Sequence, residues 1–230
     1  MSYVITPPAA AAIAVAGGGK FPVHRIYCVG RNYAEHAVEM GFSGREPPFF
    51  FMKPADAVLA VADGETGRMA YPTLTGNLHH EIELVVAIGK GGSNILAADA
   101  ADHIWGYAVG LDMTRRDLQG DMKKQGRPWC IGKAFDQSAP VGPLVAKSST
   151  GELLKGAITL SVNGTVKQQG DLSDLIWSVN ETIEQLSAAW TLQPGDLIFT
   201  GTPAGVGAVV RGDTMAGSIA GLGTLQVRVE

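Results

Sequence analysis

Strands dominate the pattern of apolar and polar positions along the chain. Residues 81–88 give the clearest case, because one face carries only aliphatic side chains and the opposite face begins with Glu81 and Glu83. Asn163-Gly164 predicts a hairpin, because both residues accept the positive φ of a tight turn. Apolar runs bounded by glycine, proline or polar residues predict further strands at residues 25–29, 49–52, 57–61, 105–112, 158–162, 165–168, 197–200 and 225–229.

Helical signals are fewer than strand signals. Ser178 and Glu181 form a capping box ahead of apolar residues at helical spacing, which predicts a helix over 179–192. A polar helix is expected over about 114–124. A second, short helix is expected from the residue after Asn32 to about Met40, with Asn32 as its N-cap. Because strands outnumber helices and do not alternate with them, the chain belongs to the α+β class and is β-rich.

Composition limits the kind of protein this is. The chain has 230 residues, of which 46% are hydrophobic and 17% charged, so it can bury the core of one domain of generous size or of two small ones. A net charge of −4 offers no basic face, and no apolar run approaches the ~20 residues of a membrane span. We therefore expect no nucleic acid and no membrane as partners. Cys28 and Cys130 lie far apart, which suits reduced thiols in a cytoplasmic protein.

The first 23 residues are rich in alanine, proline and glycine, and we expect a loosely ordered lead-in over 1–23. The apolar stretch 9–16 lacks the preceding positive charge of a signal peptide. The Gly-Gly-Gly-Lys run at 17–20 does not match a phosphate-binding loop, because Ala14 and Phe21 stand where Gly and Ser or Thr are needed.

Three carboxylates are candidates for a metal site. Glu81 and Glu83 share a strand face, with about 6.5–7 Å between their Cα atoms. Two like charges beside a buried strand are costly unless a positive group lies between them, and a hard divalent cation prefers oxygen ligands. Asp112 follows an apolar strand and is placed to project into a cleft. A solvated strand face, and a helix cap at Asp112, are the alternatives that the pattern leaves open.

Two further motifs suit acid–base chemistry. His36 and Glu39 are three residues apart on the expected helix, where the carboxylate would orient the imidazole and raise its basicity. Lys133 is a lone cation between apolar neighbours and is suited to stabilise a developing enolate. The alternatives are a surface His–Glu pair and a surface lysine. His79 and His80 are interpreted as residues that flank the carboxylate pair.

Taken in order, these motifs resemble the fumarylacetoacetate hydrolase superfamily over roughly residues 24 to 230. Within it the chain is most similar to the acylpyruvase and fumarylpyruvate hydrolase branch, because of the segment that carries His36 and Glu39 and the stretch around Lys133. The matching segments are residues 29–36, 81–83, 85–90, 110–119, 132–136, 163–164, 195–196 and 200–207.

The resemblance implies a fold and a set of roles. The fold would be the mixed β-sandwich-roll of the C-terminal domain type, as a single catalytic domain over residues 24–230 with a lid segment near 32–48. The protein would be a homodimer. One Mg²⁺ or Mn²⁺ ion per subunit would be the cofactor. The metal ligands would be Glu81, Glu83 and Asp112, the catalytic residues His36, Glu39 and Lys133, and the residues lining the substrate site Gln119 and Thr202, with Arg116 near the pyruvate end.

The implied reaction is hydrolysis of the C–C bond of a 2,4-dioxo acid, as in the conversion of fumarylpyruvate to fumarate and pyruvate in gentisate catabolism. Oxaloacetate decarboxylation, general acylpyruvase activity, isomerisation or hydration, and a non-catalytic metal-binding protein remain alternatives. Fumarylpyruvate carries a second carboxylate that needs a cation. Arg45 and Arg127 are the main candidates for that distal group, and Arg116 and Lys123 are also considered.

Overall fold

The computed structural model describes residues 3–33 and 45–230. Its central element is an eight-stranded sheet in which the β3–β15 and β5–β11 pairs run parallel and the other neighbours antiparallel. The strands lie in the order β4 (Phe50–Lys53), β3 (Ile26–Val29), β15 (Leu197–Phe199), β8 (Ile82–Ile88), β9 (Ile104–Leu111), β11 (Ala139–Val141) and β5 (Val58–Ala60), with β12 (Val145–Ala146) also paired to β9.

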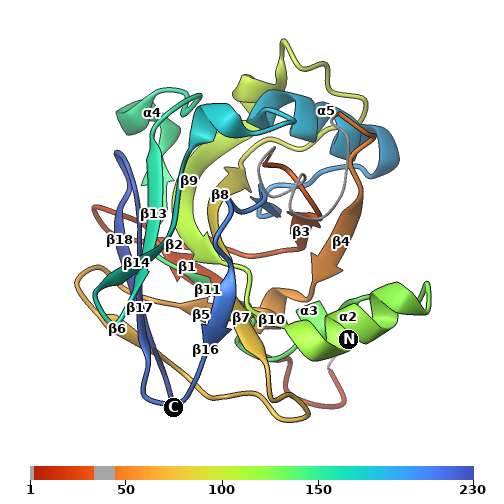
Figure 1. The fold of residues 1–230 in the computed structure, drawn as a ribbon. Coiled ribbons are helices and arrows are strands. Elements are labelled where there is room, and N and C mark those ends of the chain that lie inside the picture. The colour runs from red at the N-terminus through yellow and green to blue at the C-terminus, as the bar shows by residue number, and fades with distance from the viewer. Residues whose placement is uncertain (1–2, 34–44) are drawn as a thin grey trace.

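A second sheet of five strands packs beside the first, and Figure 1 shows its strands gathered on one side of the curled central sheet. Its order is β14 (Thr165–Asp171), β13 (Ala157–Val162), β17 (Thr214–Ile219), β18 (Gly223–Val229) and β6 (Thr66–Met69). The two small sheets are β10 (Thr114–Arg115), β7 (Leu78–His80) and β16 (Gly207–Val209), and β1 (Ala12–Ala14) with β2 (Lys20–Pro22). This arrangement confirms the expected β-rich α+β fold.

The described helices are short and lie around the sheets (Figure 1). They are α2 (Arg116–Lys124), α3 (Cys130–Lys133), α4 (Lys147–Thr150) and α5 (Val179–Ala189), with 3₁₀ turns η1 (Ala55–Ala57), η2 (Ala100–His103) and η3 (Leu172–Asp174). The capping box of Ser178 and Glu181 at the start of α5 is confirmed. Within the described part of the chain, no helix is both long enough and apolar enough to cross a membrane.

Strand β8 is buried on both faces. Ile82 and Leu84 belong to the larger core, which also takes side chains from the five-stranded sheet and from α5. Val85 and Ala87 point the other way, into a second core that lies between the central sheet and the β1–β2 hairpin. The predicted alternation is therefore correct, and a shift of one residue in register would place Glu83 in the larger core.

One expectation near the N-terminus changes. Residues 12–14 and 20–22 are not loosely ordered, because they pair as an antiparallel hairpin and place Ile13 and Phe21 in the second core. The Asn32 side chain contacts residues far along the chain, and its predicted role as an N-cap depends on residues outside the described ranges. Its amide bonds the backbone of Trp177 and Thr200 at 2.7–2.8 Å, and Tyr33 bridges to Leu175. Residues 34–40 of the expected helix lie outside the described residues.

The hairpin should contribute to the stability of the whole domain. Ile13 is fully buried, so Ile13→Ala is expected to lower the free energy of unfolding by about 2–5 kcal/mol, measured by urea denaturation. Val4→Ala is the matched control, because Val4 is fully exposed and its truncation should leave the midpoint unchanged. Equal midpoints for the two variants would mean that the hairpin does not belong to the cooperative core.

Candidate active site

Three carboxylates converge where two neighbouring strands meet. Glu83 lies in β8, Glu81 directly precedes that strand, and Asp112 directly follows β9, its antiparallel partner. The Asp112 N–H donates to the Glu81 carbonyl at 2.8 Å, which closes the junction. Each of the three residues offers a carboxylate oxygen, these atoms lie within 4.8 Å of one another, and the side chains are buried. The predicted metal ligands therefore form one cluster.

Cations surround this cluster from three other elements. Lys133, at the end of α3, places its Nζ 2.8 Å from Glu81 Oε2 and 2.6 Å from Asp112 Oδ2. Arg116, at the start of α2, pairs with the other oxygen of Glu81. Lys53, at the end of β4, lies 2.8 Å from Asp112 Oδ1. Lys133 is thus no surface lysine, and the buried acids are neutralised by side chains distant in sequence.

Lys53 is a site residue that the sequence pattern does not reveal. Its side chain is fully buried, and its ammonium also donates to the carbonyls of Lys133 and, at 3.3 Å, Met113. It therefore fixes both a carboxylate and the backbone of the helix that carries Lys133. The available signal was weak: a lysine that ends an apolar strand is normally interpreted as a residue leaving the core.

The environment shifts the pKa values of the two glutamates in opposite directions. Burial alone would raise the pKa of Glu81, but Lys133 and Arg116 outweigh it and hold that pKa below its ordinary value. Burial and the nearby charges of Asp112 and Glu81 instead raise the pKa of Glu83 well above its ordinary value. Burial lowers the pKa of Lys133, but Asp112 and Glu81 more than compensate and raise it, so the ammonium stays charged. Of the three acids, Glu83 is the one to which the described part of the chain brings the least compensation from side-chain cations.

The cluster fits a hard divalent cation. Its three side chains present only carboxylate oxygens, the ligand type that Mg²⁺ and Mn²⁺ prefer. Glu83 accepts one hydrogen bond from the Gly201 N–H at 2.7 Å through Oε2, and a cation would supply the charge compensation that this carboxylate needs. The residues present therefore suit a bound metal ion.

Gln168 connects the second sheet to this site. Its Oε1 accepts from His80 Nδ1 at 2.8 Å and from the backbone N–H of Ile82 at 3.1 Å. Its Nε2 donates to Thr202 Oγ1 at 2.8 Å and to the Pro203 carbonyl at 2.9 Å. One buried amide thereby fixes the start of β8 and the loop that carries Thr202.

The two histidines before Glu81 have supporting positions. His79 lies 3.4 Å from Arg116 Nε through its Nδ1 and 2.9 Å from Asn77 Oδ1 through its Nε2. Burial and the neighbouring charge of Arg116 lower the pKa of His79 to about 4. A neutral imidazole here can orient Arg116 without adding charge, which agrees with the interpretation of these histidines as flanking residues.

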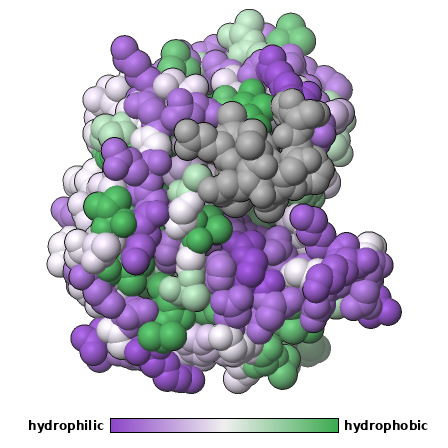
Figure 2. Space-filling view, in the orientation of Figure 1, coloured by the Kyte–Doolittle hydropathy of each residue, from purple (hydrophilic) through white to green (hydrophobic). Residues whose placement is uncertain are grey.

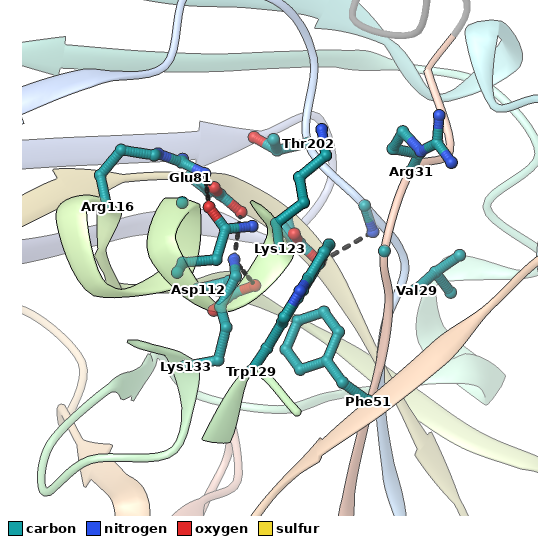
Figure 3. A pocket seen from close by; sticks show the side chains of 15 residues that line it. Val29, Arg31, Phe51, Glu81, Asp112, Arg116, Lys123, Trp129, Lys133 and Thr202 are labelled. Carbon is teal, nitrogen blue, oxygen red and sulfur yellow. Dashed lines mark hydrogen bonds and ion pairs between the residues drawn. The ribbon is translucent and has the colours of Figure 1, made fainter. Parts of the chain in front are cut away.

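A cavity of about 230 Å³ opens onto the carboxylates. Figure 3 shows Glu81, Asp112 and Lys133 on one side of it, with Trp129 and Phe51 forming an aromatic wall. The space-filling view shows a mostly hydrophilic surface along α2, the helix that lines this cavity (Figure 2). The lining residues are Val29, Gly30, Arg31, Phe51, Glu81, Glu83, Asp112, Arg116, Gln119, Gly120, Lys123, Trp129, Lys133, Gly201 and Thr202.

The cavity gathers many of the candidate residues and leaves others elsewhere. Lys133, Arg116, Gln119 and Thr202 line it together with the three acids. Arg45 pairs with Glu181, and its guanidinium lies 4.4 Å from the centroid of the Trp177 ring, in a contact separate from the cavity lining. Arg127 is exposed beyond the end of α2 and is likewise absent from the described lining. His36 and Glu39 lie outside the described residues.

Comparison with known proteins defines the class. The family described as "Fumarylacetoacetate (FAA) hydrolase C-terminal" matches residues 25–230, and the chain belongs to this family. The crystal structure of fumarylpyruvate hydrolase from Pseudomonas aeruginosa in complex with Mn²⁺ and pyruvate is 59% identical, with a TM-score of 0.97, and the match covers 99% of each chain.

Curated relatives of this family carry other activities. Human mitochondrial oxaloacetate tautomerase is 42% identical over 205 residues, which cover 89% of this chain and 91% of that protein. Mitochondrial oxaloacetate decarboxylase from Dictyostelium discoideum is 40% identical over 200 residues, covering 87% of this chain and 90% of that protein. Members of this one family are thus named for more than one reaction.

Loss of one carboxylate should weaken metal binding directly. Glu83→Gln keeps the size of the side chain but removes its charge, so affinity for Mn²⁺ should fall by more than about 100-fold in isothermal titration calorimetry. Asp63→Asn is the control, because Asp63 is an exposed acid outside the cluster. Unchanged Mn²⁺ affinity in Glu83→Gln would place the metal elsewhere.

Lys53 should be required for stability. Lys53→Met keeps much of the buried volume but removes a partner of Asp112, and loss of one partner of a buried ion pair costs about 3–5 kcal/mol. The measurement is urea unfolding in EDTA, with Lys124→Met as the control because the Lys124 side chain is 81% exposed. A loss no larger than that of the control would show that Lys53 does not compensate the acids.

Proposed function

We propose that the protein is a divalent-metal-dependent hydrolase that cleaves the C–C bond of a 2,4-dioxo acid, with fumarylpyruvate as substrate and fumarate and pyruvate as products. The observation that carries the proposal is the likeness over nearly the whole chain to a fumarylpyruvate hydrolase in complex with Mn²⁺ and pyruvate, combined with the buried carboxylate cluster. The metal would be Mg²⁺ or Mn²⁺, held by Glu81, Glu83 and Asp112.

The chain's own residues suit the pyruvate half of such a substrate. When bound, the divalent ion would supply Lewis-acid polarisation of the 2-keto oxygen. Arg116 Nη1 donates to Gln119 Oε1 at 2.9 Å, which leaves the Gln119 amide N–H groups as donors to the substrate. Thr202 Oγ1 accepts from Gln168, so its own hydroxyl hydrogen is available for a substrate carboxylate. The buried Lys133 ammonium adds positive charge beside the reacting end.

Bond cleavage requires a base and a place for negative charge. We propose that His36, oriented by Glu39, takes a proton from water while the water oxygen attacks the C4 carbonyl. The C3–C4 bond then breaks, the acyl group leaves as fumarate, and the electron pair of the bond forms the enolate of pyruvate. The proton that His36 took from water is then returned to C3. The Lys133 ammonium is suited to stabilise the enolate charge as it develops.

Oxaloacetate is the second candidate substrate. The relatives named oxaloacetate tautomerase and oxaloacetate decarboxylase favour it. Decarboxylation of oxaloacetate also ends in a pyruvate enolate but needs no attacking water, so the same carboxylate and lysine cluster would serve it. A general acylpyruvase, which accepts acyl groups other than fumaryl, is a variant of the main proposal. Homodimer formation, a cytoplasmic location and a place in gentisate catabolism belong to the same proposal.

The test is a comparison of substrates with and without metal. Loss of enol absorbance should be fast with fumarylpyruvate and Mg²⁺, should cease in EDTA, and should return when Mg²⁺ is added in excess. Oxaloacetate is assayed under the same conditions by release of CO₂ and by enol–keto exchange. Faster turnover of oxaloacetate than of fumarylpyruvate would replace the main proposal by the second candidate.

His36→Ala separates hydrolysis from binding. General base catalysis contributes typically 10²–10⁴-fold, so kcat for fumarylpyruvate should fall by about that factor. The inhibition constant of oxalate, which resembles the pyruvate end, should change little. Equal losses in kcat and in oxalate affinity would assign His36 a structural role. If the protein is instead a decarboxylase, whose reaction needs no attacking water, the His36→Ala variant would keep most of its turnover of oxaloacetate.

A further inference from the structure

Charge is distributed unevenly along the cavity. At its inner end, Glu81 and Asp112 are engaged by Lys133, and Glu81 also by Arg116. Two more cations, Arg31 and Lys123, line the same cavity but come from different elements. In Figure 3, Arg31 lies on the side opposite Glu81 and Arg116, with the side chain of Lys123 between them. Positively charged side chains therefore also line the cavity away from the carboxylate cluster.

The position of Lys123 follows from the geometry of α2. Arg116, Gln119, Gly120 and Lys123 line the cavity, and their spacing of three, four and seven residues places them on one helix face. Seven residues of α-helix span roughly 10 Å along the axis. The helix thus presents Arg116 beside Glu81 and Lys123 about two turns farther along the same wall.

Arg31 is held at the opposite wall by aromatic side chains. It follows β3, and its guanidinium carbon lies 5.3 Å from the centroid of the Phe49 ring. Phe49 in turn contacts Trp129 edge-on, with 5.3 Å between the ring centroids, and Phe51 packs against the same indole. Contact with an aromatic face favours a cation and restricts the motion of a long side chain. The planar rings of Phe51 and Trp129 would suit a flat, unsaturated acyl chain.

From this arrangement we infer that Arg31 and Lys123 bind the distal carboxylate of the substrate and give the enzyme its preference for acyl groups that end in an acid. The inference rests on the proposed function, which places the pyruvate half at the three carboxylates. A second carboxylate in the cavity is costly unless a cation meets it, and a guanidinium can bind it through two hydrogen bonds. This assignment replaces Arg45 and Arg127, which lie outside the described cavity lining.

The experiment compares fumarylpyruvate with acetylpyruvate, which has the same pyruvate half but no distal carboxylate. Arg31→Met and Lys123→Met should each lower kcat/KM for fumarylpyruvate by about 10- to 100-fold, the range for a hydrogen bond to a charged group. The kcat/KM for acetylpyruvate should change by less than about threefold. Retained acetylpyruvate turnover also shows that each variant is folded and that its pyruvate end is intact.

Three matched variants serve as controls. Lys124→Met removes a lysine from the adjacent position of α2, where the side chain is 81% exposed. Arg45→Met and Arg127→Met remove the two arginines that lie outside the described cavity lining. All three should keep the wild-type ratio of the two kcat/KM values. If Arg45→Met or Arg127→Met alone lowered the ratio, the distal group would lie at that arginine and the inference would be wrong.

The result distinguishes failure of the inference from failure of the proposed function. A wild-type protein that hydrolyses fumarylpyruvate, with variants at Arg31 and Lys123 that keep the wild-type substrate ratio, would overturn the inference alone. Equal losses on both substrates would also overturn it, because they would place these cations at the pyruvate end. A wild-type protein inactive on both acylpyruvates would overturn the proposed function, and with it the inference.

Discussion

The buried charge of three carboxylates is the constraint on which the site depends. Carboxylates removed from water destabilise a fold strongly unless cations and hydrogen bonds compensate them. Lys53, Lys133 and Arg116 supply the cations from three separate elements, β4, α3 and α2. The central sheet must hold these elements in place before the acids can be tolerated. The same electrostatic balance stabilises the core and prepares a site for a divalent ion.

The sheets also position the loops around the cavity. Strand β8 is fixed because both of its faces are buried, so its register determines where Glu83 points. Gln168 reaches from the second sheet to the start of β8 and to Thr202. Asn32, which follows β3, forms hydrogen bonds with the backbone of Trp177 and Thr200. Each buried amide makes several hydrogen bonds, so the cavity walls are positioned by contacts between segments that are far apart along the chain.

Different parts of the cavity serve the reaction and the choice of substrate. The carboxylates and Lys133 suit any reaction in which the enolate of a 2-keto acid develops, which accounts for how a hydrolase, a tautomerase and a decarboxylase can occur among relatives of one fold. Selectivity then depends on the walls beyond this cluster, where Arg31 and Lys123 lie. A change of cation there would alter the preferred acyl group without disturbing the buried ion pairs.

Local pattern alone determined the strand 81–88, the Asn163-Gly164 hairpin, the capping box of α5 and the three acids, because each depends on periodicity or turn chemistry within a few residues. The order of the motifs along the chain supported the resemblance to a known family, and this resemblance implied the roles of the residues. Only the tertiary structure showed Lys53 and Gln168 as partners of the site, because their contacts join positions more than 30 residues apart. It also brought the β1–β2 hairpin into the core and placed Arg31 in the cavity lining. Such contacts depend on how sheets curve and pack, and no local pattern encodes that.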